Sequence, residues 1–393
     1  MNDFENAAKL SELEKAASQC AKGLRYKASV SRYLINSLCM NNRLRNEVLN
    51  EKYKISKYMH FTITEPKRRE ICATRMRDRV WQKSMCNNGL RDQLLGTLIY
   101  DNGACQQHKG VDFAIDRTIC FLQKYFRQHG TNEGYYTHLD IKGYFPNTPH
   151  KETKKTVEKH VKDEKIREHV YNIIDSFKDP RDPSAINTDP FGARGTALGS
   201  EISQLMQLAL PSRIDHAIKE DLRFKYYIRF NDDMLFISDN REKLNDARRY
   251  VTEKYKEIGL TVTIKQQNAK LEHGIRFLKR RIILTRTGKV IIKPLPEKIS
   301  KERRRLRNMK KKLDAGEISM SRIEGHYQSV RAGIDRCDAG TKVQTLDNFY
   351  KQLFGQEPQK PKRRKKNAYS KSKAANRTAR GRYRKNAGRK PET

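Results

Sequence analysis

The sequence lacks long hydrophobic runs, and no stretch approaches the ~20 consecutive apolar residues that a membrane-spanning helix needs. The basic start and apolar run of a secretory signal are also missing, because Met1–Lys22 has the pattern of a polar amphipathic helix. The seven cysteines are scattered and form no CxxC pair, and the ten histidines show no HxxxH or HExxH spacing. These absences argue against a disulfide framework and a zinc site. We therefore expect a cytoplasmic protein with reduced thiols and no membrane association.

The chain has a large excess of positive charge. Lys and Arg total 83 against 46 Asp and Glu, so the formal net charge of the 393 residues is +37. A chain of this charge has a polyanion as its default partner, and nucleic acid is the first candidate. A basic ribosomal-type or chromatin-coating protein has a similar composition and stays open at this point.

The last 38 residues are the most basic part of the chain. Between Gln356 and Thr393 there are 15 Lys and Arg and only two acids, Glu357 and Glu392, which gives +13. Because this segment has almost no large aliphatic residues, it cannot offset the entropy lost on ordering. We expect a disordered tail that acts as an electrostatic arm on RNA or on an acidic partner.

Hydrophobic periodicity predicts a mixed α+β body for the rest of the chain. Residues 3–50 have helical periodicity, and 179–197 form a loop rich in Asp, Pro and Gly. Further helices are predicted over 76–85, 114–128, 151–177, 200–219, 241–258 and 296–353, and strands over 60–64, 135–141, 224–230, 234–238, 260–264, 275–284 and 289–293.

Two acidic motifs adjoin apolar strands. Asp140 ends one strand, and Asp232 and Asp233 occupy the turn of a hydrophobic hairpin. Neighbouring aspartates repel one another and are costly to bury unpaired, a conflict that a divalent cation resolves. Ligands that are all oxygen favour Mg²⁺ or Mn²⁺, and three carboxylates on neighbouring strands suit two ions ~4 Å apart. The alternative is that Asn231-Asp232-Asp233 is simply a hairpin turn, since such turns favour Asn and Asp.

Two further motifs accompany the acids. Residues Gly195–Gln204 form a GxxxGxxxSQ pattern that opens a helix, and glycines there let the backbone approach a nucleotide or a template base. Upstream, Glu65–Ile71 places cations where a triphosphate could be held. Each motif alone is weak evidence, but their order and spacing together point to nucleotide chemistry.

In this order the motifs resemble those of the reverse transcriptases, specifically the prokaryotic non-retroviral group that includes group II intron, retron and diversity-generating retroelement enzymes. The resemblance covers roughly residues 25–335. The family's two acidic boxes match Asp140–Phe145 and Asn231-Asp232-Asp233, its template-contacting helix matches Gly195–Gln204, its fingers helix matches Met76–Gln82, and its primer-gripping hairpin matches Gly274–Lys279. Three positions depart from the family pattern, with Phe230 for the usual Tyr, Ala197 for the common proline and Lys279 for the usual glycine.

The resemblance implies roles for individual residues. Asp140, Asp232 and Asp233 would be catalytic and bind metal together with Ile141, and Lys265 would protonate the pyrophosphate leaving group. Phe145 stands at the family's steric gate against ribonucleotides, although it could instead be a core aromatic under the site. The implied dNTP-binding residues are Lys67, Arg69, Phe145, Gly199 and Gln204. The basic run at the start of the thumb, which is either a solvated face or a contact to the duplex backbone, supplies the nucleic-acid-binding candidates Arg303, Arg304, Arg305, Arg307, Lys310 and Lys311.

The implied architecture is a right-hand polymerase. Residues 1–55 would form a helical N-terminal extension, 56–285 the fingers and an antiparallel palm sheet, 286–355 a helical thumb and 356–393 the basic tail. The implied activity is RNA-directed DNA synthesis with two Mg²⁺ ions, for which Mn²⁺ could substitute. Its partners would be dNTPs, an RNA template such as a cognate non-coding RNA, the DNA product and an accessory protein, in a bacterial or phage-encoded retroelement or antiviral defence system.

The motif forms narrow the subgroup. Leu198-Gly199-x-x-x-Ser203-Gln204 is typical of diversity-generating retroelements, although some phage-defence reverse transcriptases look similar. No CxxC pairs follow the thumb region, so an HNH-type zinc endonuclease is not expected, and the Val-Thr-Gly of retron enzymes is missing. Two alternatives stay open: a catalytically degenerate RNA-binding scaffold, against which the three acids argue, and an RNA-dependent RNA polymerase, against which Phe145 and the fingers motifs argue.

Overall fold

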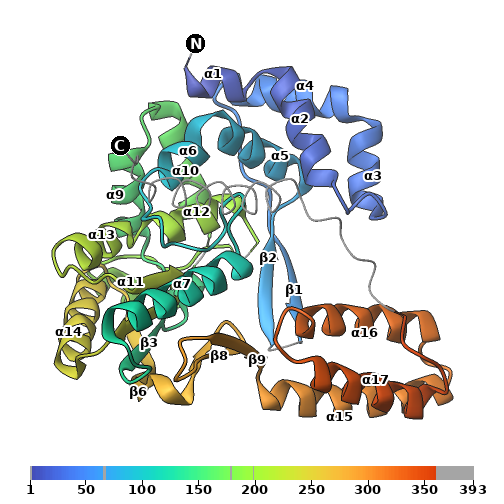
Figure 1. Ribbon diagram of the computed structural model, residues 1–393. Helices are drawn as coiled ribbons and strands as arrows, with labels where there is room; N and C mark the ends of the chain where they lie inside the picture. The colour runs from blue at the N-terminus through green and yellow to red at the C-terminus, as the bar shows by residue number, and fades with distance from the viewer. Residues whose placement is uncertain (1, 65–67, 178, 198, 360–393) are drawn as a thin grey trace, which may run out of the picture. The chain divides into compact units, whose positions relative to one another are not determined.

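The computed structural model describes residues 2–64, 68–177, 179–197 and 199–359 (Figure 1). The chain divides into two compact units, the first formed by Met1–Leu278 and Ile282–Val290 and the second by Lys279–Arg281 and the chain from Ile291 onward. The predicted mixed class of helices and antiparallel sheet is confirmed. Within the described ranges, no helix combines the length and the apolar character that crossing a membrane requires. Most of the predicted tail lies outside the described residues, which end at Gln359.

The predicted helical N-terminus is confirmed as four helices that belong to a larger core. They are α1 (Asp3–Ala7), α2 (Leu10–Ala21), α3 (Ala28–Ile35) and α4 (Ser37–Leu49). Buried residues of these helices pack with α5 (Met76–Met85), whose Trp81 is fully buried and donates a hydrogen bond from Nε1 to Nδ1 of His169 at 3.3 Å. The first 50 residues therefore share one hydrophobic core with the segments that follow. The division into extension, fingers and palm, thumb and tail stays a prediction.

A two-stranded hairpin follows the N-terminal helices. Strand β1 (Met59–Ile63) matches the predicted strand and pairs antiparallel with β2 (Arg69–Ala73), in a register that places Ile63 opposite Arg69. The sequence did not predict β2, because Arg69 and Glu70 at its start interrupt the alternation of polar and apolar residues that marks a strand. Residues 65–67 between the strands, and with them Lys67, lie outside the described residues.

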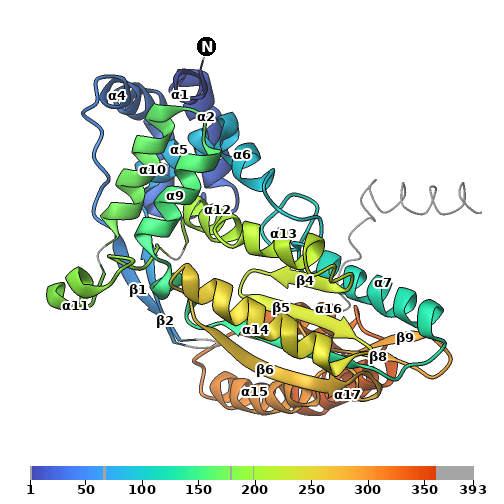
Figure 2. The ribbon, with the colours of Figure 1, turned by 90° about the vertical axis from the view of Figure 1, so that its left-hand side faces the viewer.

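The central sheet has four strands in the order β4-β5-β3-β6, all antiparallel. They are β3 (Tyr135–Ile141), β4 (Tyr227–Phe230), β5 (Asp233–Ser238) and β6 (Val262–Lys270). Leu139, Met234 and Phe236 point into a core that includes Leu244 and Val251 of α14 (Arg241–Glu257), the helix that crosses this face of the sheet in Figure 2. Because side chains alternate along a strand, the residues next to these core positions point to the opposite face. Asp140 and Asp233 are two of them.

Two of the predicted long helices are each broken into two. Residues 151–177 form α9 (His150–His160) and α10 (Glu164–Ser176), because Asp163 caps the second helix by accepting a hydrogen bond from the backbone N–H of Ile166. Residues 200–219 form α12 (Glu201–Ala209) and α13 (Ser212–Glu220), which are separated at Pro211, a residue without a backbone N–H. Short helices also replace the predicted turn at 143–146 and part of the loop at 179–197, namely α8 (Tyr144–Asn147) and α11 (Pro183–Thr188).

The remaining elements differ from the predictions in their division and bounds: the predicted helical region 296–353 forms three helices, the strands predicted over 224–230 and 260–264 are Tyr227–Phe230 and Val262–Lys270, and the helix Arg91–Leu95 was not predicted. The predicted strand over 275–284 is two strands, because Leu278 and Lys279 both have positive φ angles, 46° and 61°, and form a turn. The strands β7 (Ile275–Phe277), β8 (Arg280–Leu284) and β9 (Val290–Pro294) form a sheet in that order. The remaining helices are α6 (Arg91–Leu95), α7 (Val111–His129), α15 (Pro296–Asp314), α16 (Met320–Ile334) and α17 (Gly340–Phe354), with a π-helical segment at Cys86–Leu90 and a 3₁₀ segment at Leu271–His273. Helices α15, α16 and α17 share a core of their own around Leu306, Tyr327 and Tyr350.

An ion pair with no solvent exposure anchors the central hairpin. The guanidinium Nε of Arg229 on β4 lies 2.7 Å from Oδ2 of Asp215 on α13, and both side chains are 0% exposed. The hydroxyl of Tyr227 donates to the other oxygen of Asp215 at 2.6 Å, while Arg229 also donates to the carbonyl oxygens of Leu208 and Asn231 at 2.7 and 3.2 Å. Nε, Nη1 and Nη2 of Arg229 each donate one of these hydrogen bonds. The charge pair therefore connects α12, α13 and the hairpin turn.

Breaking this pair should destabilise the fold strongly. We expect Arg229→Met to lower the free energy of unfolding by about 3–5 kcal/mol, because it leaves the Asp215 carboxylate buried without its cation. Tyr227→Phe is the matched control, since it removes one hydrogen bond to the same carboxylate and should cost about 1 kcal/mol. Chemical denaturation of the two variants provides the measurement, and equal small losses would show that the pair does not anchor the hairpin.

Candidate active site

Three aspartates meet at one edge of the central sheet. Asp140, the penultimate residue of β3, is directly opposite Asp233, the first residue of β5, and Asp232 precedes it in the turn. One carboxylate oxygen from each of the three lies within 4.8 Å of the others, and all three residues are half-buried. The structure therefore brings together the three acids that the sequence singled out.

Backbone hydrogen bonds hold the turn that carries Asp232. Phe230 pairs with Asp233 across the β4–β5 hairpin, and Asn231 in the turn has a φ of 53°, a left-handed conformation that Asn tolerates better than most residues. The N–H of Ile141 donates to the carbonyl oxygen of Asp232 at 3.0 Å. The end of β3 and the turn are thus linked directly. The side chain of Ile141 is buried, so a metal contact from this residue would have to come from its backbone.

The electrostatics of the cluster show the strain of gathering like charges. Burial, and then the charges of Asp233 and Asp140, raise the pKa of Asp232 above its ordinary value. Burial alone would also raise the pKa of Asp233, but hydrogen bonds from His138 and Lys265 outweigh it, and this pKa lies below the usual value. The cluster therefore needs positive charge beside it.

Lys265 supplies one such charge from β6. Its Nζ lies 2.7 Å from Oδ1 of Asp140 and 2.6 Å from Oδ1 of Asp233, so one ammonium group bridges two of the three acids. Burial would lower the pKa of Lys265, but the hydrogen bonds to the two carboxylates raise it. The resemblance assigned Lys265 to proton donation; the structure brings it to the carboxylates themselves, and its role stays a prediction.

His138 is a site residue that the sequence reading missed. Its Nε2 lies 2.8 Å from Oδ1 of Asp233, and only 8% of its side chain is exposed. It stands two residues before Asp140 on the same strand, so strand alternation places both side chains on the same face. This spacing of two residues was the signal in the sequence, and it predicts only that His138 and Asp140 share a face of the strand. The contact with Asp233 depends on the pairing of β3 with β5.

The donor set fits divalent cations. It consists of three carboxylates on adjacent backbone segments, and the ammonium of Lys265 occupies the position of a cation between two of them. Hard cations such as Mg²⁺ and Mn²⁺ prefer carboxylate oxygen. The cluster can therefore hold divalent cations, and among the described residues the grouped metal ligands are carboxylates alone, whereas structural zinc sites favour Cys and His.

The glycine-rich motif forms the wall of a hollow beside α12. Gly199 has a φ of 116°, which requires glycine, although an added Cβ would contact nothing within 4 Å. Ser200 caps α12, and its hydroxyl donates to Oε1 of Gln82 on α5 at 2.9 Å. Gly199 and Gln204 line the same hollow of about 290 Å³, together with Lys83 and Cys105. Two of the predicted nucleotide contacts therefore share a cavity.

Phe145 lies near this motif on α8. Its carbonyl oxygen accepts a hydrogen bond from the N–H of Thr196 at 3.0 Å, and its ring is half-buried. The neighbouring Tyr144 is the core aromatic of this turn, with 4% exposure and a hydroxyl that donates to the carbonyl oxygen of Gln207. Phe145 is thus partly open to solvent, and its role as a gate stays a prediction.

The other predicted site residues that the structure describes lie on other elements. Arg69 is exposed on β2, and in the described ranges no hydrogen bond joins it to the three aspartates. The thumb candidates all lie on α15 in the second unit. There, the guanidinium groups of Arg303 and Arg307 lie over the ring of Phe349 at 5.4 and 5.1 Å, while Arg304 and Lys311 are exposed. Of the remaining candidates, Arg305 is half-buried and Lys310 forms an ion pair with Asp314.

Comparison with known proteins identifies the domain. The sequence model of the family described as "Reverse transcriptase (RNA-dependent DNA polymerase)" matches residues 63–278, a range that contains the three aspartates and the glycine-rich motif. A search of curated proteins found no match.

Solved structures similar to the chain include telomerases. Apo telomerase from Candida tropicalis shares 13% identity at a TM-score of 0.45, with 63% of this chain and 52% of that chain covered. Telomerase from Candida albicans in complex with a TWJ fragment of telomeric RNA shares 11% identity at a TM-score of 0.43, with 82% and 66% covered. The chain therefore spans between about half and two thirds of the length of these telomerase chains.

The carboxylate cluster should bind a divalent cation without any substrate. We expect Asp232→Asn to weaken Mn²⁺ binding roughly tenfold or more, because affinity in such sites follows the number of charged ligands. Asp239→Asn, at an acid that is 57% exposed and lies beyond the other end of β5, is the control and should bind Mn²⁺ as the unaltered protein does. Electron paramagnetic resonance of Mn²⁺ measures both, and equal affinities would place the cation elsewhere.

Proposed function

The chain belongs to the reverse transcriptase family, and we propose that it is an RNA-directed DNA polymerase that copies an RNA template into complementary DNA. The observation that carries this proposal is the convergence of Asp140, Asp232 and Asp233 at one sheet edge. A scaffold protein would gain nothing from three mutually repelling carboxylates, whereas nucleotidyl transfer requires such a set. The glycine-rich hollow beside α12 supports the proposal, because it offers space for a nucleotide or template base.

The chemistry is assigned to this cluster. Asp140, Asp232 and Asp233 would hold two divalent cations, Mg²⁺ with Mn²⁺ as a substitute, aided by the backbone of Ile141; when bound, these ions activate the primer 3′-hydroxyl and stabilise the charge of the phosphates. His138 keeps the Asp233 carboxylate oriented through its 2.8 Å contact. Lys265 remains protonated beside the acids, which is the state required to donate a proton to the pyrophosphate leaving group.

The remaining roles concern positioning of substrates. Lys67 and Arg69 would bind the triphosphate, and Gly199 and Gln204 would contact the nucleotide and template. Phe145 would exclude a ribose 2′-hydroxyl, because a flat apolar ring leaves that hydroxyl without a hydrogen-bond partner. The exposed cations of α15, including Arg304 and Lys311, would contact the backbone of the product duplex.

We further propose a biological setting. The form Leu198-Gly199-x-x-x-Ser203-Gln204 favours a prokaryotic enzyme of the diversity-generating retroelement or phage-defence type, acting in the cytoplasm. Its template would be a cognate non-coding RNA, and an accessory protein would assist it. The division into N-terminal extension 1–55, fingers and palm 56–285, thumb 286–355 and tail 356–393 belongs to the same proposal.

Removing one carboxylate should separate catalysis from binding. We expect Asp232→Ala or Asp233→Ala to reduce primer extension on an RNA template by roughly a thousandfold or more, because several kcal/mol of charge stabilisation are lost. RNA affinity should stay nearly unchanged, since these acids repel phosphate. Primer extension and filter binding on the same preparations measure both effects. Extension at the unaltered rate in either variant contradicts the assignment, with Asp239→Ala as the active control.

Shortening Phe145 should relax sugar selection. We expect Phe145→Ala to raise the ratio of ribonucleotide to deoxyribonucleotide incorporation by roughly tenfold or more, because the space over the sugar opens. Phe145→Tyr keeps the ring and should keep the ratio. Competitive incorporation of the two nucleotide types is the measurement, and an unchanged ratio in an active Phe145→Ala protein would place the gate at another residue.

A further inference from the structure

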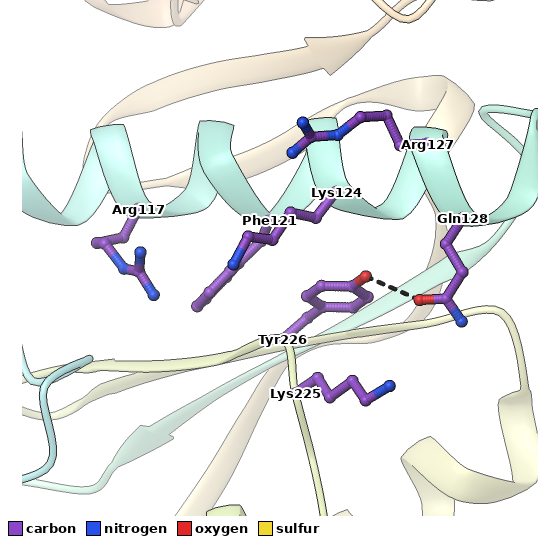
Figure 3. A pocket seen from close by; sticks show the side chains of 7 residues that line it. All are labelled: Arg117, Phe121, Lys124, Arg127, Gln128, Lys225 and Tyr226. Carbon is purple, nitrogen blue, oxygen red and sulfur yellow. Dashed lines mark hydrogen bonds between the residues drawn. The ribbon is translucent and has the colours of Figure 1, made fainter. Parts of the chain in front are cut away.

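A second hollow, lined by several cations, lies in the first unit between α7 and the start of β4. It has a volume of about 550 Å³ and is lined by Arg117, Phe121, Lys124, Arg127, Gln128, Lys225 and Tyr226 (Figure 3). Five of these residues come from α7 at positions that share one side of the helix, and the other two directly precede β4. The hollow is large enough to admit one nucleotide unit, since ligand sites of 300–1,000 Å³ hold whole small molecules.

The cations of the hollow differ in their partners. Arg117 forms an ion pair with Asp101, with its Nε 2.6 Å from Oδ1, and is thereby neutralised. Lys124, Arg127 and Lys225 are exposed, and in the part of the chain that the structure describes no carboxylate forms an ion pair with them. No acidic residue lines the hollow. Three positive charges around one cavity therefore favour a ligand that carries several negative charges.

Aromatic rings form the other part of the wall. The rings of Phe121 and Tyr226 lie 5.7 Å apart at an interplanar angle of 52°, and Figure 3 shows Tyr226 between α7 and Lys225. The hydroxyl of Tyr226 donates to Oε1 of Gln128 at 3.1 Å, which fixes the ring while leaving the side chain half-buried. A fixed, partly open aromatic ring among cations can stack on a nucleobase whose phosphates bind the surrounding lysines and arginines.

This hollow is separate from the three aspartates. Asp232 and Asp233 lie at one end of the β4–β5 hairpin, whereas Tyr226 precedes the other end of β4 and its carbonyl oxygen accepts from the N–H of Ile237. Phe230 lies four residue steps beyond Tyr226 along the strand, which corresponds to about 13 Å at ~3.3 Å per residue. Helix α7 follows the same direction: Ala114 lies near Phe230, and Gln128 contacts Tyr226.

We propose that this hollow binds an unpaired segment of single-stranded nucleic acid, with one base stacked on Tyr226 and phosphates held by Lys124, Arg127 and Lys225. A duplex cannot supply the stacked base, because its bases are paired and covered by their neighbours. The site would hold a strand outside the polymerising centre, either RNA of the template or newly made DNA. It does not depend on polymerisation and exists whether or not the proposed activity is correct.

The test compares two charge-reversed proteins of equal net charge. One carries Lys124→Glu with Arg127→Glu, and the control carries Lys159→Glu on α9 with Lys256→Glu on α14, both exposed positions. Fluorescence anisotropy with labelled oligo(U) RNA and oligo(dT) DNA measures affinity over a salt series. We expect the pocket variant to lose roughly tenfold more affinity than the control for at least one probe, with a log–log salt slope lower by about 1.4, because two single-strand phosphate contacts of ~0.7 each are lost.

Tyr226 provides a second, independent arm. Tyr226→Ala should weaken binding roughly five- to hundredfold through loss of the stacked base, whereas Tyr226→Phe keeps the ring and should bind normally. Photo-cross-linking of 4-thiouridine RNA and 4-thiothymidine DNA to the unaltered full-length protein needs no variant to fold. At least one of the two single strands should label the tryptic peptide 226–229, and the corresponding duplexes should not.

The binding measurements distinguish the possible ligands of the hollow. Loss of RNA affinity alone identifies the template as the ligand, and loss of DNA affinity alone identifies the product strand. Equal affinities of the pocket variant and its control for both probes, or cross-links confined to other peptides, would overturn the proposal.

Discussion

The pairing of Asp140 with Asp233 across β3 and β5 is the constraint on which the rest of the site depends. Two carboxylates in direct register repel each other, and Asp232 in the adjoining turn adds a third negative charge. Two contacts stabilise the site against this repulsion. The buried ion pair between Arg229 and Asp215 anchors the β4–β5 hairpin, and the ammonium group of Lys265 bridges Asp140 and Asp233. Such an arrangement is stable when positive charge is supplied, and it is ready to take up cations together with a negatively charged substrate.

Much of this could be predicted from the sequence, because the signals are local. The position of acids at the end of an apolar strand and in the turn of a hydrophobic hairpin predicted the three aspartates, and the order of motifs predicted the family that the comparison found. The glycine-rich motif was predicted to contact nucleotide, and Gly199 and Gln204 do share a hollow. Helix ends were less accurate. The breaks at Asp163 and Pro211 depend on a capping hydrogen bond and a missing donor, which a hydrophobic period extending through both positions concealed.

The parts that could not be predicted are contacts between distant segments. The hydrogen bond between His138 and Asp233 and the double contact of Lys265 exist only once β3 has paired with β5 and β6. The hollow beside α7 has the same origin, since Lys225 and Tyr226 lie about a hundred residues after the helix whose cations complete it. His138, Lys225 and Tyr226 belong to no recognisable motif, and the resemblance that singled out Lys265 did not indicate which carboxylates it contacts. They became site residues because of where the sheet places them, and they extend the charge pattern of a strongly basic chain into two separate surfaces.

The measurement that tests the central claim most directly is the chemical identity of the product. Purified full-length protein is incubated with an RNA template, an annealed primer and Mg²⁺, and receives either the four deoxyribonucleotides or the four ribonucleotides. The account predicts a full-length product from deoxyribonucleotides that resists RNase and is degraded by DNase. A product made only from ribonucleotides, or primer left unextended with both sets on RNA and DNA templates alike, would contradict it.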